Sequence, residues 1–175
     1  MSSSLCCYGQ VNKRGGAATN INVVDSEYRL NFPEYGFSIN APCVMKDVSA
    51  HSSGNFLLNY GGVTDENNPK KIAAYQLIVI RVPVGYRDLS KEEYERMVDK
   101  ALRLQAQRFK TFKPVQFGYE EYPGYVCETS HNGYGQKGVY FAKENYIIAL
   151  TVISNNNLNA KFNTFTNGFR SLPNK

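Results

Sequence analysis

The chain has 175 residues, of which 42% are hydrophobic and 20% are charged, and its net charge is +5. This composition is typical of one globular domain and excludes disorder along the whole chain. No apolar run approaches the roughly 20 residues of a membrane-spanning helix, and the charge is too small to argue for nucleic acid. We therefore expect no transmembrane segment and no nucleic-acid partner.

Residues 1–27 are predicted to be a flexible leader, followed by a single domain at 28–175. The leader contains many Gly, Ala, Ser and Asn residues and few large apolar ones, so it has little to bury in a core. It has neither the basic start nor the long apolar stretch of a complete signal peptide. One hypothesis is that it is the remnant of an export signal.

Three strands are predicted in the first half of the domain. Residues 35–40 alternate apolar and polar positions, which is the period of a half-buried strand. Residues 55–60 are expected to form the next strand, ending at Gly61 and Gly62. Residues 72–82 form a nearly continuous apolar run, which predicts a central strand covered on both faces of the sheet.

A long helix is predicted to begin after Ser90. Ser90 and Glu93 have the spacing of a capping box, in which each side chain binds a free backbone N–H of the other residue. Lys113 and Pro114 are expected to end the run. Apolar residues recur at helical spacing and predict one buried stripe: Tyr94, Met97, Val98, Ala101, Leu104, Phe109 and Phe112.

An antiparallel meander and a terminal helix are predicted for the remainder. The strands are expected at 115–119, 125–130, 137–143 and 146–153, with a tight turn or bulge at 122–125. Asn132-Gly133 is a strong hairpin signal because both residues tolerate positive φ. A helix is predicted at 158–172, capped by Asn156 or Asn157. Its apolar seam is Leu158, Phe162, Phe165, Phe169 and Leu172.

The order of these elements predicts an α+β fold, an αβα sandwich in which helices flank an antiparallel sheet. The order and spacing of four segments resemble the Mog1/PsbP-like fold family, which includes bacterial proteins of the DUF1795 and DcrB kind. These segments are 35–42, the capped helix from Ser90, 118–125 and the hairpin at 145–150 with its closing helix. Together they cover about residues 28–172.

The resemblance implies a protein that is generally not an enzyme and that works by binding other proteins. Relatives in that family include a Ran-GTPase-binding factor, an extrinsic photosystem subunit, chaperones for secreted effectors and envelope lipoproteins. The family has no shared catalytic motif, so the resemblance assigns no catalytic residue and no cofactor to this chain.

Cysteine chemistry is poorly supported by the sequence. The four cysteines are Cys6, Cys7, Cys43 and Cys127, with no C-x-x-C pair, and the histidines are His51 and His131. We expect no metal site, because structural zinc needs ligands in tight local clusters. Cys43 and Cys127 are expected to be buried small side chains, although a pairing between them stays open.

Two further motifs suggest nucleotide binding or catalysis, but a purely structural role explains each of them better. Residues 133–138 match G-x-G-x-x-G, but a strand follows where a dinucleotide site needs a helix, so a glycine-rich hairpin is favoured. Cys127 with His131 is a thiol–base candidate, but four residues along an extended strand separate them by about 13 Å. Catalytic residues are therefore predicted to be absent.

Two groups of residues are candidates for binding. Basic side chains gather near the end of the long helix, where they either complement the negative helix terminus, which we favour, or bind an anion: Lys100, Arg103, Arg108, Lys110 and Lys113. Tyrosines gather near the turn and hairpin, and Tyr is favoured at protein interfaces: Tyr119, Tyr122, Tyr125 and Tyr134. We expect these tyrosines to form the partner site.

The leading hypothesis is a non-enzymatic protein-binding or adaptor domain of the bacterial cell-envelope type, located outside the cytoplasm. One alternative is a cytoplasmic chaperone for a secreted effector. Another is a small hydrolase that uses Cys127. Burial of Cys127 would argue against the last, and the native compartment separates the first two.

Overall fold

The computed structural model describes residues 28–49, 56–64, 67–68, 71–82 and 90–172. The helices are α1 (Lys91–Ala106) and α2 (Leu158–Thr166), with a short 3₁₀ helix η1 (Pro33–Tyr35). The strands are β1 (Tyr28–Phe32), β2 (Phe37–Ala41), β3 (Lys46–Asp47), β4 (Leu58–Thr64), β5 (Ala73–Arg81), β6 (Thr111–Phe117), β7 (Tyr122–His131), β8 (Tyr134–Lys143), β9 (Tyr146–Ser154) and β10 (Phe169–Ser171).

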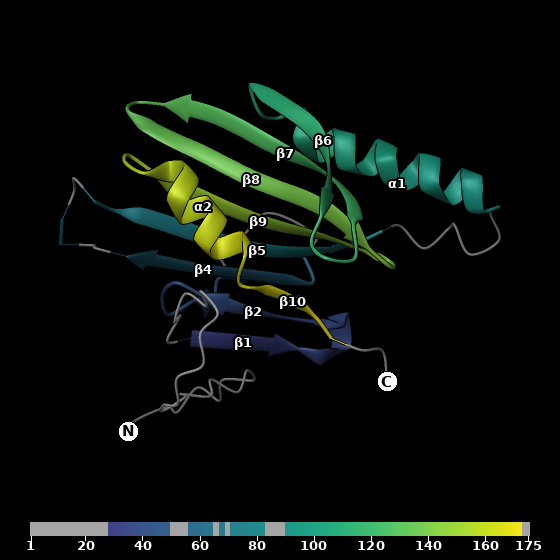
Figure 1. Ribbon diagram of the computed structural model, residues 1–175, viewed down its shortest axis with the longest axis horizontal. Helices are drawn as coiled ribbons and strands as arrows, with labels where there is room; N and C mark the ends of the chain where they lie inside the picture. The colour runs from purple at the N-terminus through teal and green to yellow at the C-terminus, as the bar shows by residue number, and fades with distance from the viewer. Residues whose placement is uncertain (1–27, 50–55, 65–66, 69–70, 83–89, 173–175) are drawn as a thin grey trace.

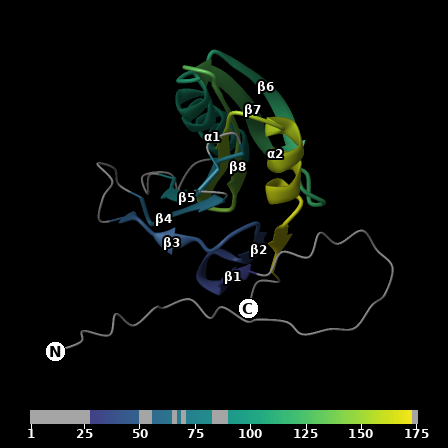
Figure 2. The same ribbon diagram turned by 90° about the vertical axis from the view of Figure 1, so that its left-hand side faces the viewer.

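The strands form two antiparallel sheets. The large sheet has seven strands in the order β3–β4–β5–β9–β8–β7–β6, and the small sheet has three in the order β1–β2–β10. Helices α1 and α2 lie on opposite sides of the large sheet (Figures 1 and 2). The α+β fold with an antiparallel sheet between helical layers is therefore confirmed, and the small sheet adds to the α2 layer.

The face of the large sheet that carries α2 is closed by aromatic packing, and we call it the α2 face. The ring of Phe141 on β8 stacks on Phe117 of β6, with centroids 4.2 Å apart, and meets Phe169 of β10 at 5.1 Å. From α2, the side chain of Phe165 packs edge-on against Tyr75 at 5.4 Å. Burial of these rings, at about 25 cal/mol per Å² of apolar surface, joins the two sheets into one core.

The opposite face, which we call the α1 face, has a smaller core under α1. The buried side chains Val98 and Leu102 of α1 lie against Tyr125 and Cys127 of β7 and against residues of β8 and β9. Among the described elements, α1 contacts β7 and β8, which lie in the half of the sheet far from β4. Of the elements that the structure describes, α1 therefore covers one half of the α1 face only.

The predicted helix cap is confirmed, whereas the predicted apolar stripe is partly wrong. The Ser90 Oγ accepts a hydrogen bond from the Glu93 N–H, and a Glu93 carboxylate oxygen accepts one from the Ser90 N–H at 2.9 Å. The helix ends at Ala106, so Phe109 and Phe112 lie beyond it, and Phe112 belongs to β6. Leu102 is buried while Leu104 is 55% exposed, because the helix turns Leu104 away from the sheet.

The doubly covered strand is β9 and not the predicted 72–82. Burial along β5 alternates, so that one side of it packs in the α2-face core and the other side is half-buried. In β9, the residues from Ile147 to Val152 are all buried, and β9 lies one strand nearer the middle of the sheet. Both segments are apolar in sequence, but α1 packs on β7 and on β8, the neighbour of β9 on the side away from β5.

The predicted terminal helix at 158–172 is too long. Helix α2 ends at Thr166, and Phe169 enters β10, which pairs with β2. The Asn40 N–H donates to the Gly168 carbonyl at 2.9 Å, and a side chain at Gly168 would collide with the Asn40 carbonyl. This backbone contact ends the helix. Asn157 occupies the N-cap position, but its side chain makes no capping bond.

Two further predictions are wrong because they placed a strand end or a turn at glycines that lie within strands. The strand predicted to end at Gly61 and Gly62 continues through both to Thr64. The turn predicted at 122–125 lies at 118–121 instead, where Gly118 and Glu121 have φ of 74° and 54°. Gly124 is inside β7, close to the Tyr140 carbonyl.

Two other predictions near these turns can be compared with the structure. The strand predicted at 115–119 begins earlier, at Thr111, and ends at Phe117. The predicted Asn132-Gly133 hairpin is confirmed, with φ of 51° and 80° at its two residues.

Some predictions fall outside the described residues. The leader at 1–27 lies there with Cys6 and Cys7, as do His51 and the first residue of the strand predicted at 55–60. Within the described residues, no helix is long and apolar enough to cross a membrane.

Candidate functional site

The four predicted tyrosines do not form one surface. Tyr119 is 99% exposed at the turn before β7, whereas Tyr134 is 40% exposed at the hairpin after β7. A strand of this length spans about 30 Å, so the two lie at opposite ends of β7. Tyr122 packs in the α2-face core, and Tyr125 is buried under α1 on the other face.

Tyr125 fixes α1 to the sheet. Its hydroxyl donates to the Asp99 carboxylate at 2.6 Å, and the Arg103 guanidinium lies 5.6 Å above its ring. The hydrogen bond from Tyr125 and the contact with Arg103 lower the pKa of Asp99, and burial raises the pKa of Tyr125. This is a structural arrangement in which the carboxylate stays ionised and holds both partners.

Tyr122 also joins two elements of the fold, on the α2 face. Its hydroxyl and the Ser171 hydroxyl lie 2.9 Å apart, which links β7 to β10. Its ring packs near Phe141, at 5.9 Å between centroids, and the Lys143 ammonium lies 5.9 Å from its centroid. Of the four tyrosines, Tyr119 and Tyr134 therefore have the exposure that a direct binding role needs.

The two described cysteines are unpaired and buried. Cys127 has no exposed surface, and burial raises its pKa to about 12. Burial likewise raises the pKa of Cys43 to about 11. A thiol nucleophile needs access and a lowered pKa, and Cys127 has neither. His131, the proposed base, is exposed at the hairpin turn.

The glycine-rich motif at 133–138 has the predicted structural role. Gly133 lies in the hairpin turn with φ of 80°, and the rest of the motif lies within β8. No helix follows it, because β8 continues to Lys143 and β9 begins at Tyr146. The motif therefore lacks the helix N-terminus that binds a pyrophosphate.

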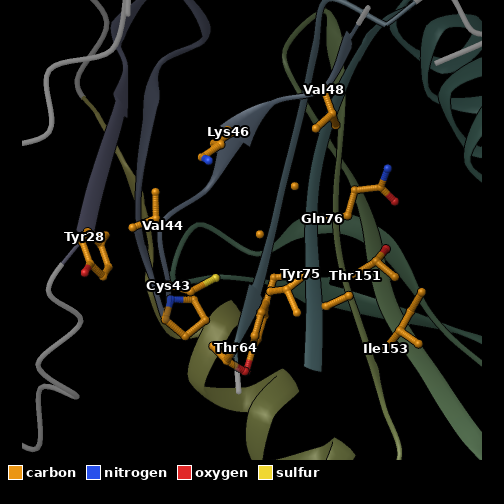
Figure 3. A pocket seen from close by; sticks show the side chains of 15 residues that line it. Tyr28, Cys43, Val44, Lys46, Val48, Thr64, Tyr75, Gln76, Thr151 and Ile153 are labelled. Carbon is orange, nitrogen blue, oxygen red and sulfur yellow. The ribbon is translucent and has the colours of Figure 1, made fainter. Parts of the chain in front are cut away.

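A groove beside β4 was not predicted from the sequence. Its volume is about 870 Å³, and its walls come from the 42–48 connection, β4, β5 and β9 (Figure 3). In Figure 3, Cys43 and Val44 lie on one side, and Gln76, Thr151 and Ile153 lie on the other. Gly61, which is paired with Gln76 and shares its face, adds no side chain to the lining.

The groove opens onto the half of the α1 face that α1 does not cover, which we call the open half. Val63, Ala74 and Ile153 are paired directly across β4, β5 and β9, so their side chains share this face. Val63 and Ile153 are 39% and 38% exposed, and Val44 in the groove wall is 51% exposed. These residues form an exposed aliphatic row across the sheet.

A polar row runs beside the aliphatic one. Gly61, Gln76 and Thr151 are paired across the same strands. The Gln76 side-chain amide donates to Asn59 Oδ1 at 3.0 Å, and Asn59 is buried, so the floor of the open half is held by a hydrogen bond. The exposed Lys46 is the cation of the groove lining. This lining suits apolar contacts with a few polar ones.

The sequence contained one signal for the open half. Gln76 interrupts an otherwise apolar run. A strand covered on both faces would not need a polar side chain at that position. The exposure of Val44, Val63 and Ile153 had no sequence signal, because it depends on where α1 ends.

Within the described residues, no three His, Cys, Asp or Glu side chains gather as a metal site would need.

Three comparisons with known proteins cover family models, curated proteins and solved structures. The sequence matches no family model and no curated protein. The structure is similar to the solution structure of cyanobacterial PsbP (CyanoP) from Synechocystis sp. PCC 6803. The TM-score is 0.49 at 12% sequence identity, over 90% of this chain and 99% of that one. PsbP is one of the two proteins after which the fold family that the sequence resembles is named.

Proposed function

We propose that this protein is a non-enzymatic protein-binding domain of the bacterial cell-envelope type, and that its partner docks apolar side chains on the open half. The observation that carries the proposal is the exposed aliphatic row of Val44, Val63 and Ile153 beside the groove. Contiguous exposed apolar surface on a folded domain commonly marks an interaction site.

The physical basis of binding is burial of this row. Each aliphatic side chain is already half covered and held by the sheet, so docking costs little conformational entropy. The strands beneath are rigid, and the Gln76–Asn59 hydrogen bond leaves the floor satisfied whether or not a partner is bound. The expected ligand is a segment of another protein with apolar side chains, and Lys46 would contact its acidic or carbonyl groups.

Site-specific photo-crosslinking in the source cells tests this proposal. A photoreactive residue is placed at Val63, at Ile153 or at Tyr119, where Tyr119 is exposed in the turn between β6 and β7, at the opposite edge of the sheet from the groove. We expect one protein to crosslink from positions 63 and 153 and not from 119. The same products from all three positions would contradict the proposal.

The captured partner is then purified and its affinity measured by calorimetry. Ile153→Asp should weaken binding at least tenfold, because it places a charge in an apolar contact, while Tyr119→Asp should change it less than about threefold. The reverse ranking would move the site to the predicted tyrosines. Fractionation of the source cells tests the envelope setting, and a cytoplasmic protein would favour the chaperone alternative.

A further inference from the structure

The positive charge of this protein is concentrated in one short segment. Residues 100–119 contain five basic side chains and no Asp or Glu, whereas the rest of the chain has 15 of each sign. The whole net charge of +5 therefore belongs to this segment. We call its cations the basic corner: Lys100, Arg103, Arg108, Lys110 and Lys113.

The basic corner occupies one outer edge of the fold. It runs from the second half of α1, through the connection, into β6, which is the edge strand of the large sheet (Figure 1). All five of its side chains are exposed. Because α1 ends at Ala106, Arg103 is its cation in the last helical turn. From the sequence we favoured the explanation that these cations complement the negative helix terminus. In the structure, that explanation applies to Arg103 among the five.

The cations are mostly unpaired. Arg103 Nε lies 2.9 Å from the Asp99 carboxylate. Within the described part of the chain, Lys100, Arg108, Lys110 and Lys113 have no acidic partner. Clustered like charges repel one another and cost stability, and an acidic ligand would relieve that cost.

Exposed apolar groups lie among these cations. Phe112 is 41% exposed, and its ring packs edge-on against Tyr125 at 5.8 Å. The Arg103 guanidinium lies over the same Tyr125 ring at 5.6 Å, so one ring contacts both a cation and an exposed aromatic side chain of this corner. Leu104 on α1 is 55% exposed. A ligand at this corner meets positive charge and apolar surface together.

We infer that the basic corner binds an acidic segment of a partner protein that also carries apolar side chains. The site is separate from the open half and does not depend on the function proposed there. A flexible segment suits the corner better than a flat anionic membrane, because Phe112 and Lys113 are consecutive in β6 and point to opposite faces of the sheet. A peptide can contact both faces by passing around the edge strand.

Fluorescence anisotropy with defined peptides tests this inference on the full chain. The probe is a labelled peptide of Glu-Glu-Phe repeats, with Gln-Gln-Phe repeats as the neutral comparison. The test variant is the triple substitution Lys100→Gln, Lys110→Gln and Lys113→Gln. Its control is Lys71→Gln, Arg81→Gln and Lys91→Gln, which removes the same charge from exposed positions elsewhere.

The expected result is binding of the acidic probe that weakens as salt is added and that the neutral probe does not reproduce. The corner triple variant should lose at least about tenfold in affinity and the control triple less than about threefold. Phe112→Ser, with every charge kept, should lose about threefold, because the apolar contact is removed.

Three results would overturn the inference. The first is an equal loss in both triple variants, which would mean that net charge alone attracts the probe. The second is no binding of the acidic peptide. The third is binding to phosphatidylglycerol vesicles that depends on the corner, with no corner dependence for the peptide, which would assign the corner to a membrane.

Discussion

The two faces of the large sheet are built from the same strands and have opposite properties. The α2 face is closed by a helix and a second sheet, and Phe141, Leu77 and Leu150 on it have no exposed surface. The α1 face is covered by one helix over β7 and β8, and its other half exposes Val63 and Ile153. Stability is therefore concentrated on one face, and surface open to ligands lies on the other.

This division explains how a small domain can leave apolar surface exposed without losing its fold. An exposed aliphatic row costs little when the opposite face supplies a continuous aromatic core. Substitutions on the α2 face should change the free energy of unfolding, whereas substitutions on the open half should change binding. Matched pairs of variants, one from each face, test this difference.

The largest effect is expected from Phe141→Ala on the α2 face. Phe141 is fully buried and its ring stacks on Phe117 at 4.2 Å, so truncation leaves a cavity in the core. The free energy of unfolding should fall by about 3–5 kcal/mol, measured by urea denaturation. Ile153→Ala on the open half should cost less than about 1 kcal/mol. Similar losses for the two variants would contradict the division between the faces.

Two adjacent glycines in β4 provide the next comparison. A Cβ at Gly62, on the α2 face, would lie 2.5 Å from the Val44 carbonyl oxygen, whereas a Cβ at Gly61 would lie 3.6 Å from Val48. Gly62→Ala should destabilise the protein by about 2 kcal/mol, because backbone must shift. Gly61→Ala should be close to neutral in the same denaturation assay. A destabilising Gly61→Ala would mean that the open half is more tightly packed than its exposure indicates.

The buried cysteines predict a loss of stability at alkaline pH. Burial raises the pKa of Cys127 to about 12 and that of Cys43 to about 11, so the folded state keeps protons that the unfolded state releases near pH 9. Stability is therefore full below pH 9 and falls as pH rises towards these raised values, by about 2 kcal/mol for Cys127 at about pH 10.5. Thermal melts of the wild type and of Cys127→Ala from pH 8 to about pH 11 measure this loss of stability. The variant should show the weaker pH dependence, and parallel curves would refute the assignment.

The smallest effect is expected from two tyrosine hydroxyls, one on each face. Tyr125→Phe removes a bond to the ionised Asp99 and should cost about 1 kcal/mol, while Tyr122→Phe removes a neutral bond to Ser171 and should cost less. The hydrogen bond lowers the pKa of Asp99, so its contribution is present above pH 4 and is lost as pH falls through the lowered value. Denaturation of the two variants at neutral and at acidic pH measures these losses of stability. A loss in Tyr125→Phe that is unchanged at acidic pH would contradict the bond to the ionised Asp99 as its cause.

The strands and turns with a strong local pattern could be predicted from the sequence. Ser90 and Glu93 form the capping box expected from their spacing, and Asn132-Gly133 forms the expected hairpin. The four tyrosines illustrate what failed. Their closeness along the chain did not make them a surface, because β7 separates Tyr119 from Tyr134 and its alternation sends Tyr122 and Tyr125 to opposite faces.

The amino-acid sequence by itself determined the α+β class, the helix start and the hairpin, because each depends on residues within a few positions of one another. Only the tertiary structure decided that Phe169 joins β10 and not a helix, that β9 is the doubly covered strand, and that α1 leaves half of one face open. These outcomes depend on which distant segments compete for the same apolar surface. No local pattern records that competition, because its energy comes from contacts between segments far apart in the chain.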